Sequence, residues 1–207
     1  LPERLARHRL SPEMLRAERP ELIVGRISGF GAEGPRADDP AFDMGQFARA
    51  YALAAYKADT LEDARQAARS TSIILDDEMS LHVKFCAGWG LTIDDMLNVP
   101  EAPQCMAYTR YVLEAGQAGD ILDLQVALAP CVVGYAEVAN RLMASPATRL
   151  DGNPYRAWIE TYAGEDYQKV AAAAVAQLDR LYARRAGPGR DPSLVKLFAG
   201  ASRLEAD

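Results

Sequence analysis

The stretch Ala127-Leu-Ala-Pro130-Cys131-Val-Val-Gly-Tyr135-Ala-Glu137 lies inside an apolar segment that extends from about residue 120 to residue 144. Pro130 cannot donate to a helical hydrogen-bond ladder, so we expect a kink just before Cys131. The thiol of Cys131 and the phenol of Tyr135 are then predicted to point together into the core. Two interpretations stay open, because the pair is either ordinary core packing or a reactive site. Steps of three and four predict one buried helix face made of Leu124, Leu128, Cys131, Tyr135, Val138 and Leu142.

The composition of the 207-residue chain indicates a soluble, helix-rich protein, because 49% of its residues are hydrophobic and 25% are charged. The net charge is −6 and no basic run is interleaved with aromatic residues, which argues against a nucleic-acid partner. Three scattered cysteines, Cys86, Cys105 and Cys131, favour reduced thiols in a cytoplasmic enzyme over disulfides. We expect no membrane association either, since no apolar run approaches the length of a membrane span and no signal peptide is recognisable.

From about residue 44 onward the sequence predicts one helix after another. Thr60, with Asp63 three residues later, is expected to cap the second of them. Gly116 and Gly119 are expected to break the chain before the cysteine-containing helix. The predicted helices cover 46–58, 61–88, a short piece from 92, 104–114, 120–144, 154–163, an alanine-rich segment to 185, and a last segment from 191.

The last predicted helix carries a carboxylate at the end of an apolar face. Its stripe consists of Leu194, Leu197, Phe198, Ala201 and Glu205. A carboxylate in that position costs free energy unless it is paired or functional. The other interpretation is a frayed C-terminus that leaves Glu205 in water.

Residues 1 to about 43 follow a different pattern. Ser11-Pro12-Glu13 starts a short predicted helix, residues 21–27 form a predicted strand, and a glycine-rich turn follows over 28–35. This run, which continues through residues 39–43, resembles a fragment of the class III CoA-transferases, in which the aspartate at the place of Asp43 is catalytic. One strand without partners cannot form a sheet, so a working CoA-transferase is excluded. We therefore expect an α/β-like segment over 1–43, not independent, and a helical domain over 44–207.

Six pieces of the portion from about residue 46 to residue 205 resemble the thiaminase II (TenA) family. The resemblance implies an all-α, haem-oxygenase-like bundle, usually a homotetramer, that needs no metal or other cofactor. It also implies hydrolysis of aminopyrimidine breakdown products of thiamin, and of thiamin itself, with release of hydroxymethylpyrimidine. The pieces are Phe47-Ala-Arg-Ala-Tyr-Ala-Leu-Ala54, Asp77-Glu-Met-Ser-Leu-His82, Ala107-Tyr-Thr109, Pro130-Cys131 with Tyr135-Ala-Glu137, Pro154-Tyr-Arg-Ala-Trp-Ile-Glu-Thr-Tyr162, and Ala201-Ser-Arg-Leu-Glu205.

The same resemblance assigns roles to five residues. Cys131 matches the family's nucleophile and Glu205 its acid–base carboxylate, while Tyr108, Tyr135 and Tyr162 match the tyrosines that line the substrate pocket. A pyrimidine suits such a pocket, because a phenol ring stacks on it while the hydroxyl binds its polar groups. The other two cysteines are expected to be packing residues.

The resemblance fails just before the first helix of the bundle. Residues 39–43 stand where the family carries Gln-Asp-Tyr-x-Tyr, so Pro40 takes the place of an aspartate that binds the aminopyrimidine edge. Proline cannot make that hydrogen bond, and substrate binding is expected to suffer. Asp43 is our candidate replacement among the substrate-binding residues, and whether it or Asp39 takes over stays open.

Two other functions remain as alternatives. Glu78 and His82, four residues apart, could form half of a di-iron oxidase site together with Glu137. The chain's other histidine is His8, so the ligand set is incomplete, and a hydrogen-bonded Glu78–His82 pair that fixes helix packing is the preferred interpretation. The second alternative is a non-catalytic protein that binds a pyrimidine or only assembles.

Overall fold

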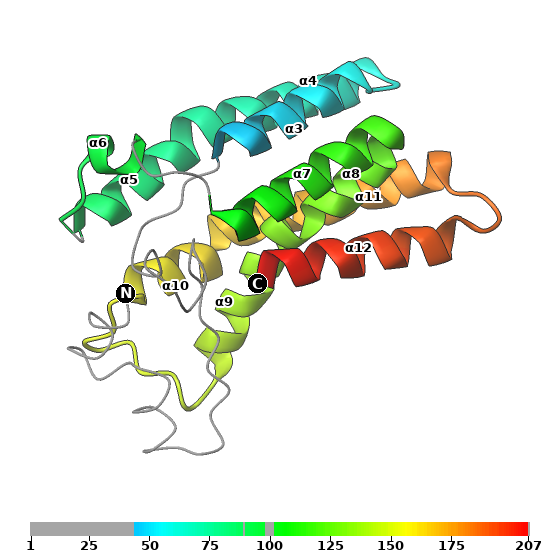
Figure 1. Cartoon of the computed structure of the whole chain (residues 1–207). Coiled ribbons are helices and arrows are strands. Elements are labelled where there is room, and N and C mark those ends of the chain that lie inside the picture. Colours follow the sequence, from blue (N-terminus) through cyan, green and yellow to red (C-terminus); the bar gives the residue numbers. More distant parts are fainter. Residues whose placement is uncertain (1–43, 89, 98–101, 207) are drawn as a thin grey trace.

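The structure is a computed structural model that describes residues 44–88, 90–97 and 102–206 of the chain. The predicted N-terminal helix, strand and glycine-rich turn, with Pro40 and Asp43, lie outside the described residues. All regular elements in the described ranges are helices, which confirms the predicted all-α fold (Figure 1). They are α3 (Met44–Tyr56), α4 (Leu61–Ser72), η1 (Ile73–Glu78), α5 (Met79–Gly88), α6 (Ile93–Leu97), α7 (Pro103–Ala118), α8 (Ile121–Ala129), η2 (Pro130–Gly134), α9 (Tyr135–Ala144), α10 (Arg156–Ala163), α11 (Glu165–Arg185) and α12 (Arg190–Ala206).

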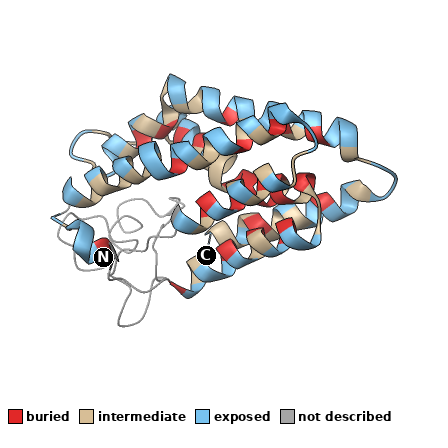
Figure 2. Cartoon of the chain, turned by 90° about the horizontal axis from the view of Figure 1, so that it is seen from above, coloured by how far each residue is buried: buried red, intermediate tan, exposed pale blue. Residues whose placement is uncertain are grey.

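Helices α7 and α8 lie in the middle of the bundle. On one side α3 packs against both of them, and α4 packs against α3; on the other side α11 contacts α8, and α12 contacts both central helices (Figure 1). At one end α9 packs against α10, and the C-terminal helix α12 contacts η2. Buried residues gather on the helix faces that meet between these layers (Figure 2). The arrangement therefore brings the C-terminal helix to the segment that contains Cys131.

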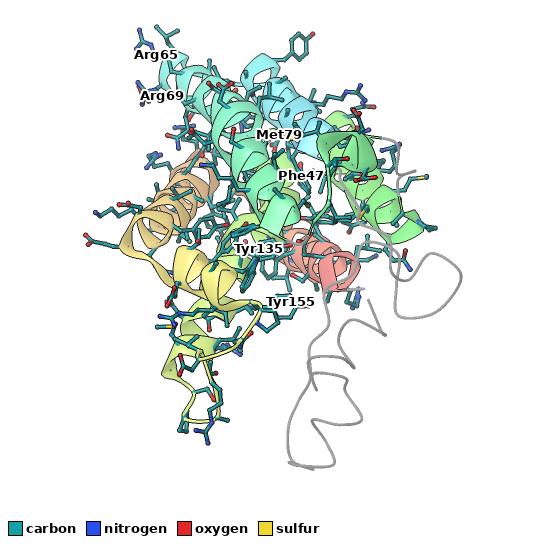
Figure 3. The ribbon with its side chains drawn as sticks, turned by 90° about the vertical axis from the view of Figure 1, so that its left-hand side faces the viewer. Phe47, Arg65, Arg69, Met79, Tyr135 and Tyr155 are labelled. Atoms are coloured by element: carbon teal, nitrogen blue, oxygen red, sulfur yellow. The ribbon has the colours of Figure 1, made fainter. Side chains whose placement is uncertain are left out.

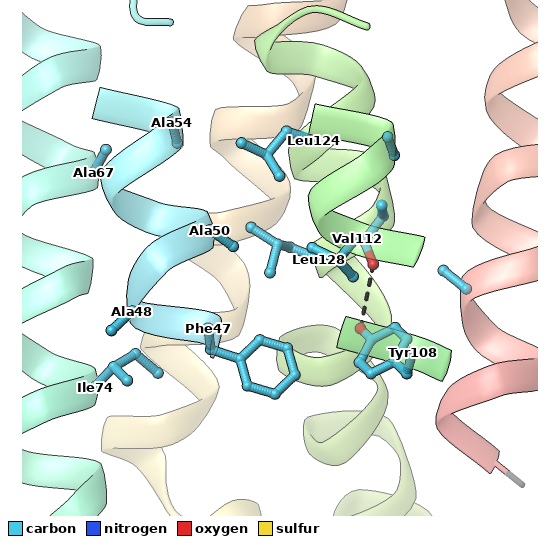
Figure 4. Packing of buried hydrophobic residues seen from close by; sticks show 13 residues of the cluster. Phe47, Ala48, Ala50, Ala54, Ala67, Ile74, Tyr108, Val112, Leu124 and Leu128 are labelled. Carbon is cyan, nitrogen blue, oxygen red and sulfur yellow. Dashed lines mark hydrogen bonds between the residues drawn. The ribbon is translucent and has the colours of Figure 1, made fainter. Parts of the chain in front are cut away.

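The main core lies between α3, α7 and α8 (Figure 4). Ala50 and Ala54 of α3 are fully buried, and their small side chains let α3 approach the larger Leu124 and Leu128 of α8. Burying one leucine side chain contributes roughly 1.5–3 kcal/mol relative to exposing it. Phe47 continues the same face of α3 toward the end of the bundle where α12 meets η2.

Gly116 does not end α7, contrary to prediction, because the helix continues to Ala118 and Gly119 is its C-cap. A Cβ atom at position 116 would lie 2.7 Å from Leu124 Cδ1 and 2.9 Å from Leu53 Cδ2. The glycine therefore serves the close approach of α7 to its neighbours. Its sequence signal is the same as that of a helix breaker, so the contact could not be foreseen from spacing alone.

The predicted cap at Thr60 is confirmed. Its hydroxyl oxygen accepts a hydrogen bond of 3.1 Å from the backbone N–H of Asp63 and donates one of 2.7 Å to the Asp63 carboxylate. Arg184 of α11 donates to the same buried carboxylate at 2.5 Å. Burial raises the pKa of Asp63, but the hydrogen bonds from Thr60 and Arg184 and the arginine's charge outweigh burial and leave that pKa lowered. This local cap thus also ties α4 to α11.

Two long helices are interrupted by π-helical turns. The segment η1 lies between α4 and α5, where the N–H of Met79 donates to the carbonyl of Ile74, and η2 lies between α8 and α9. A π-turn contains one more residue than an α-turn, so it shifts the phase of every side chain that follows it. We predicted a kink at Pro130, and a π-turn begins at this residue.

The phase shift overturns one predicted core residue. Val138, placed on the buried face by regular helical spacing, is 46% exposed, whereas Ala136 and Ala139 are buried instead. The prediction is wrong because it continued a regular period across η2. In α12 the predicted stripe is partly right: Leu194 and Ala201 are buried, but Phe198 is 45% exposed.

By length and composition, residues 121–144 could cross a membrane, which corrects our expectation that no apolar run reaches that length. Half of this stretch is buried inside the bundle, where α8 is a central helix packed against α3, α7, α11 and α12. Its apolar character is therefore explained by its place in the core.

Candidate active site

The thiol of Cys131 stands at the second position of η2, half-buried and packed against the main core. The buried hydroxyl of Tyr108 donates to the carbonyl of Ala127 at 3.2 Å (Figure 4). The backbone of Cys131 hydrogen-bonds the same phenolic oxygen. In a regular α-helix the carbonyl of Ala127 accepts from the N–H of Cys131, four residues later. Tyr108 therefore hydrogen-bonds both backbone groups, the Ala127 carbonyl and the backbone of Cys131, at the point where the α-helical pattern gives way to the π-turn.

An aromatic cluster lies next to this turn. The ring of Tyr135 lies 5.4 Å from that of Tyr162 and 5.8 Å from that of Trp158, between ring centroids. Tyr162 also contacts Tyr167 at 4.5 Å, and the Tyr167 hydroxyl donates to the carbonyl of Val132, the residue after Cys131. Rings from α9, α10 and α11 thus gather around one side of η2. Figure 3 shows Tyr135 and Phe47 in the interior at this end of the bundle, with Arg65 and Arg69 at the outer surface.

The carboxylate of Glu205 reaches the same place from α12. That helix continues to Ala206, so Glu205 lies within it, half-buried, and not in a frayed end. The Tyr135 hydroxyl hydrogen-bonds the Glu205 carboxylate. The charges of Cys131 and Glu205 both act on Tyr108 and on Tyr135. The structure therefore brings four of the predicted site residues together.

Tyr162 joins this group through its ring contact with Tyr135 and through the charge of Cys131, which acts on it. It is 2% exposed, and Tyr108 is 3% exposed. Asp43 is the one predicted site residue that lies outside the described residues. Its role as a substrate-binding residue stays a prediction, as do the catalytic roles of Cys131 and Glu205.

Burial raises the pKa of each phenol in this cluster, and the nearby negative charges raise it further. The Glu205 carboxylate and then the Cys131 sulfur are the main charges at Tyr135. At neutral pH the phenols consequently stay protonated and act as hydrogen-bond donors. The Tyr135 hydroxyl, as a neutral donor to Glu205, stabilises the anionic form of that carboxylate without adding charge.

Two members of the group were not among our candidate site residues. Tyr51 of α3 packs against the core beside Cys131, and the charges of Cys131 and Glu78 both raise its pKa. The same two charges act on Tyr167. Tyr51 follows Phe47 by one helical turn, and this spacing carries no sign of a site. The sequence around Tyr167 gave no indication of a functional site, because the residues that Tyr167 contacts are far away in the sequence.

The other two cysteines differ from Cys131 in their surroundings. Cys86 is half-buried in α5, and burial raises the pKa of its thiol, which makes it a poorer nucleophile at neutral pH. Cys105 stands in the first turn of α7, where its carbonyl accepts from the Thr109 hydroxyl at 2.8 Å. All three cysteines are reduced in the described part of the chain.

The acidic residues considered for a di-iron site do not gather. Glu137 is exposed on α9, where Arg141 pairs with it at 2.6 Å. Within the ranges that the structure describes, no group of three or more His, Cys, Asp or Glu side chains is placed to hold a metal ion. Glu78 and His82 are paired, but the predicted buried hydrogen bond between them is wrong: 3.7 Å separates Glu78 Oε1 from His82 Nε2, and the two side chains are 27% and 33% exposed.

We expect the buried phenols to make the fold sensitive to alkali. Because the pKa of Tyr108, Tyr135 and Tyr162 is raised on folding, the folded state holds these protons more tightly than the unfolded state does. Their contribution to the free energy of unfolding is complete below pH about 10 and is lost as the pH rises beyond it. Absorbance of tyrosinate near 295 nm and circular dichroism should then change together. Ionisation of these phenols in a chain that stays folded would contradict the prediction.

Known proteins resemble this chain in sequence and in fold. A sequence model of the TENA/THI-4/PQQC family matches residues 44–207. An uncharacterized protein of Haemophilus influenzae is 36% identical over 159 residues, which cover 77% of this chain and 73% of the relative. An aminopyrimidine aminohydrolase of Halalkalibacterium halodurans is 29% identical over 159 residues, covering 77% of this chain and 70% of that protein. The crystal structure of a TenA family transcription regulator from Silicibacter sp. TM1040 has a TM-score of 0.72 and 37% identity, covering 79% of this chain and 73% of that one.

The fold and its cluster of phenols, thiol and carboxylate define a helical bundle of the haem-oxygenase-like type. Within that class the chain belongs to the TENA/THI-4/PQQC family, because the family match covers most of its length. Its relatives connect it with thiamin-related chemistry.

Proposed function

We propose that this protein is an aminopyrimidine aminohydrolase of the thiaminase II type that acts in thiamin salvage and degradation. The observation that carries the proposal is the convergence of Cys131 and Glu205 on the same two phenols, Tyr108 and Tyr135. A nucleophile with an acid–base group beside it is the arrangement that hydrolysis through a covalent intermediate requires. Family membership and the aminohydrolase relative support the substrate class.

The proposed reaction exchanges an amine for water at the exocyclic carbon of an aminopyrimidine. The thiolate of Cys131 adds to the ring and suspends its aromaticity, and Glu205 gives a proton to the amine, which leaves as ammonia. Water then adds to the exocyclic carbon and loses a proton to Glu205, after which the thiolate leaves and the ring becomes aromatic again. The balance is one aminomethylpyrimidine and one water consumed, and one hydroxymethylpyrimidine and one ammonia formed. With thiamin the leaving group is the thiazole.

The surrounding phenols have supporting roles in this proposal. The rings of Tyr108, Tyr135 and Tyr162 flank the pyrimidine. The hydroxyls of Tyr108 and Tyr135 donate within the protein, to the Ala127 carbonyl and to Glu205, and the Tyr162 hydroxyl offers a hydrogen bond to a polar group of the substrate. Tyr135 also orients Glu205 through their hydrogen bond. Asp43 is proposed to contribute a further polar contact to the substrate. We propose that the protein acts in the cytoplasm as a homotetramer without a metal or other cofactor. Sedimentation of the purified chain would test the tetramer.

An assay with two substrates tests the proposal. We expect the protein to convert 4-amino-5-aminomethyl-2-methylpyrimidine into hydroxymethylpyrimidine and ammonia, and to cleave thiamin more slowly. Product is measured by chromatography, and ammonia by a coupled assay. Binding of hydroxymethylpyrimidine without any turnover would instead favour the non-catalytic pyrimidine-binding alternative. The matched variants for this assay are Cys131→Ser and Glu205→Gln.

A further inference from the structure

Glu78 is the last residue of η1, and the π-turn directs it inward. Ile74 of the same turn is buried in the main core, and Met79 packs against that core. Because the N–H of Met79 bonds to the carbonyl of Ile74, five residues earlier, positions 78 and 79 both lie over position 74. Both π-turns of the described chain therefore hold a chemically active side chain, Cys131 in η2 and Glu78 in η1.

The Glu78 carboxylate shares its surroundings with Cys131. Its charge and the charge of Cys131 act on the same three phenols, Tyr51, Tyr162 and Tyr167. These phenols come from α3, α10 and α11, so Glu78 of η1 and Cys131 of η2 act on one aromatic cluster from two different segments. The Glu78 carboxylate therefore lies close enough to the cluster for its charge to be felt by all three phenols.

The carboxylate is also accessible and weakly held. In the part of the chain that the structure describes, its ion-pair partner is His82, and their separation of 3.7 Å is too long for a hydrogen bond. The side chain of Glu78 is 27% exposed and that of His82 is 33% exposed. Glu205, by contrast, already hydrogen-bonds Tyr135, so the two carboxylates at this cluster differ in what they can still bind.

Among the described residues, the phenols and the thiol of the cluster do not supply a hydrogen-bond acceptor for the amino group of an aminopyrimidine. Protonated phenols and a thiol chiefly donate hydrogen bonds, which suits the ring nitrogens of the ligand. The exocyclic 4-amino group is a donor and needs an acceptor, and a buried donor without one loses free energy. Glu78 is a partly exposed carboxylate among the described residues whose charge acts on this cluster, and it can accept such a hydrogen bond.

We propose that Glu78 is a substrate-binding residue whose carboxylate accepts a hydrogen bond from the 4-amino group of the pyrimidine, with His82 as its positioning partner. This inference rests on the proposed function, since it names how the same site selects its substrate. Glu78 then recognises the amino group of the substrate, while Cys131 and Glu205 carry out the proposed hydrolysis. The preference for aminopyrimidines over pyrimidines that lack the amino group then depends chiefly on Glu78, and Asp43 is left with the further polar contact proposed above.

The test compares two ligands on three proteins by isothermal titration calorimetry. The ligands are 4-amino-5-hydroxymethyl-2-methylpyrimidine and its analogue without the 4-amino group. We expect the natural chain to bind the amino compound at least about tenfold more tightly. In Glu78→Ala the two dissociation constants should become equal within about twofold, and Glu78→Gln, which keeps one acceptor oxygen, should lie between. KM for the aminomethyl substrate should rise by the same factor while kcat changes less than threefold.

The matched control is Glu137→Gln, because Glu137 also pairs with a residue one turn later but is exposed on α9. It should bind both ligands like the natural chain. Circular dichroism checks the fold of each variant, and if Glu78→Ala does not fold, Glu78→Gln decides alone. Equal weakening of both ligands would show a merely structural residue and overturn the inference. If both ligands bind equally more weakly to Glu78→Ala but hydrolysis still depends on Cys131, the proposed function stands and only the role of Glu78 is lost. If the natural chain binds neither pyrimidine, the proposed function and the role of Glu78 are both overturned.

Discussion

Cys131→Ser is expected to lower kcat for aminopyrimidine hydrolysis by at least about 10³-fold while leaving the dissociation constant of hydroxymethylpyrimidine within about threefold. A serine hydroxyl has almost the same size as the thiol, so the packing against Tyr108 and the core should survive. Its oxygen is hardly ionised near neutral pH, however, and is a far weaker nucleophile toward an aromatic ring. Steady-state kinetics and calorimetric titration of the product measure the two quantities.

Cys86→Ser provides the matched control for this substitution. Cys86 is also half-buried in a helix, but it lies in α5 and burial raises the pKa of its thiol. Its replacement should leave kcat unchanged within about twofold. A Cys131→Ser protein that keeps more than a tenth of the natural rate would show that the reaction does not pass through this sulfur, and direct attack by water would replace the covalent step.

For Glu205→Gln we expect kcat to fall by about 10²–10⁴-fold, which is the usual contribution of a positioned acid–base group. Glutamine keeps the hydrogen bond with Tyr135 but can neither give a proton to the leaving amine nor take one from water. The pH–rate profile should therefore lose the limb that reports ionisation of this carboxyl. Thiamin, whose leaving group does not need a proton in the same way, should be less affected than the aminomethyl compound.

Glu160→Gln is the control here, because Glu160 is an exposed glutamate of α10 that pairs with Arg156 at 2.8 Å. It should retain the natural rate and pH profile. Tyr135→Phe should reduce kcat less than Glu205→Gln does, since it removes the hydrogen bond that orients the carboxylate but not the carboxylate itself. An unchanged pH profile in Glu205→Gln would mean that another group handles the protons.

Several elements of the fold could be predicted because their causes are local. Thr60 and Asp63 are three residues apart, so their reciprocal hydrogen bonds depend on a single helical turn. The helix around Pro130 could also be predicted from adjacent residues. The period of the apolar side chains indicates a helix, and the missing N–H of proline indicates where its hydrogen bonding is interrupted. Family resemblance then added the candidate roles of Cys131 and Glu205, which spacing alone left open.

Other predictions failed where the deciding contact is distant in the sequence. Gly116 was expected to break a helix, but it is required by the approach of Leu124 and Leu53 from two other helices. Val138 was expected to be buried, but the extra residue in η2 turns it outward. A sequence period assumes a constant helix, and it cannot detect a π-turn whose stability comes from packing around it.

The sequence by itself determined that the chain from residue 44 onward forms helices, where most of them begin and end, and which residues are chemically able to act. The tertiary structure decided that Cys131, Glu205 and Glu78 meet the same group of phenols, although they lie in three different helices. The physical reason is the range of the forces involved. Caps and helical periods act within one or two turns, whereas the position of a thiol relative to a carboxylate depends on how whole helices pack and on the phase shift at each π-turn.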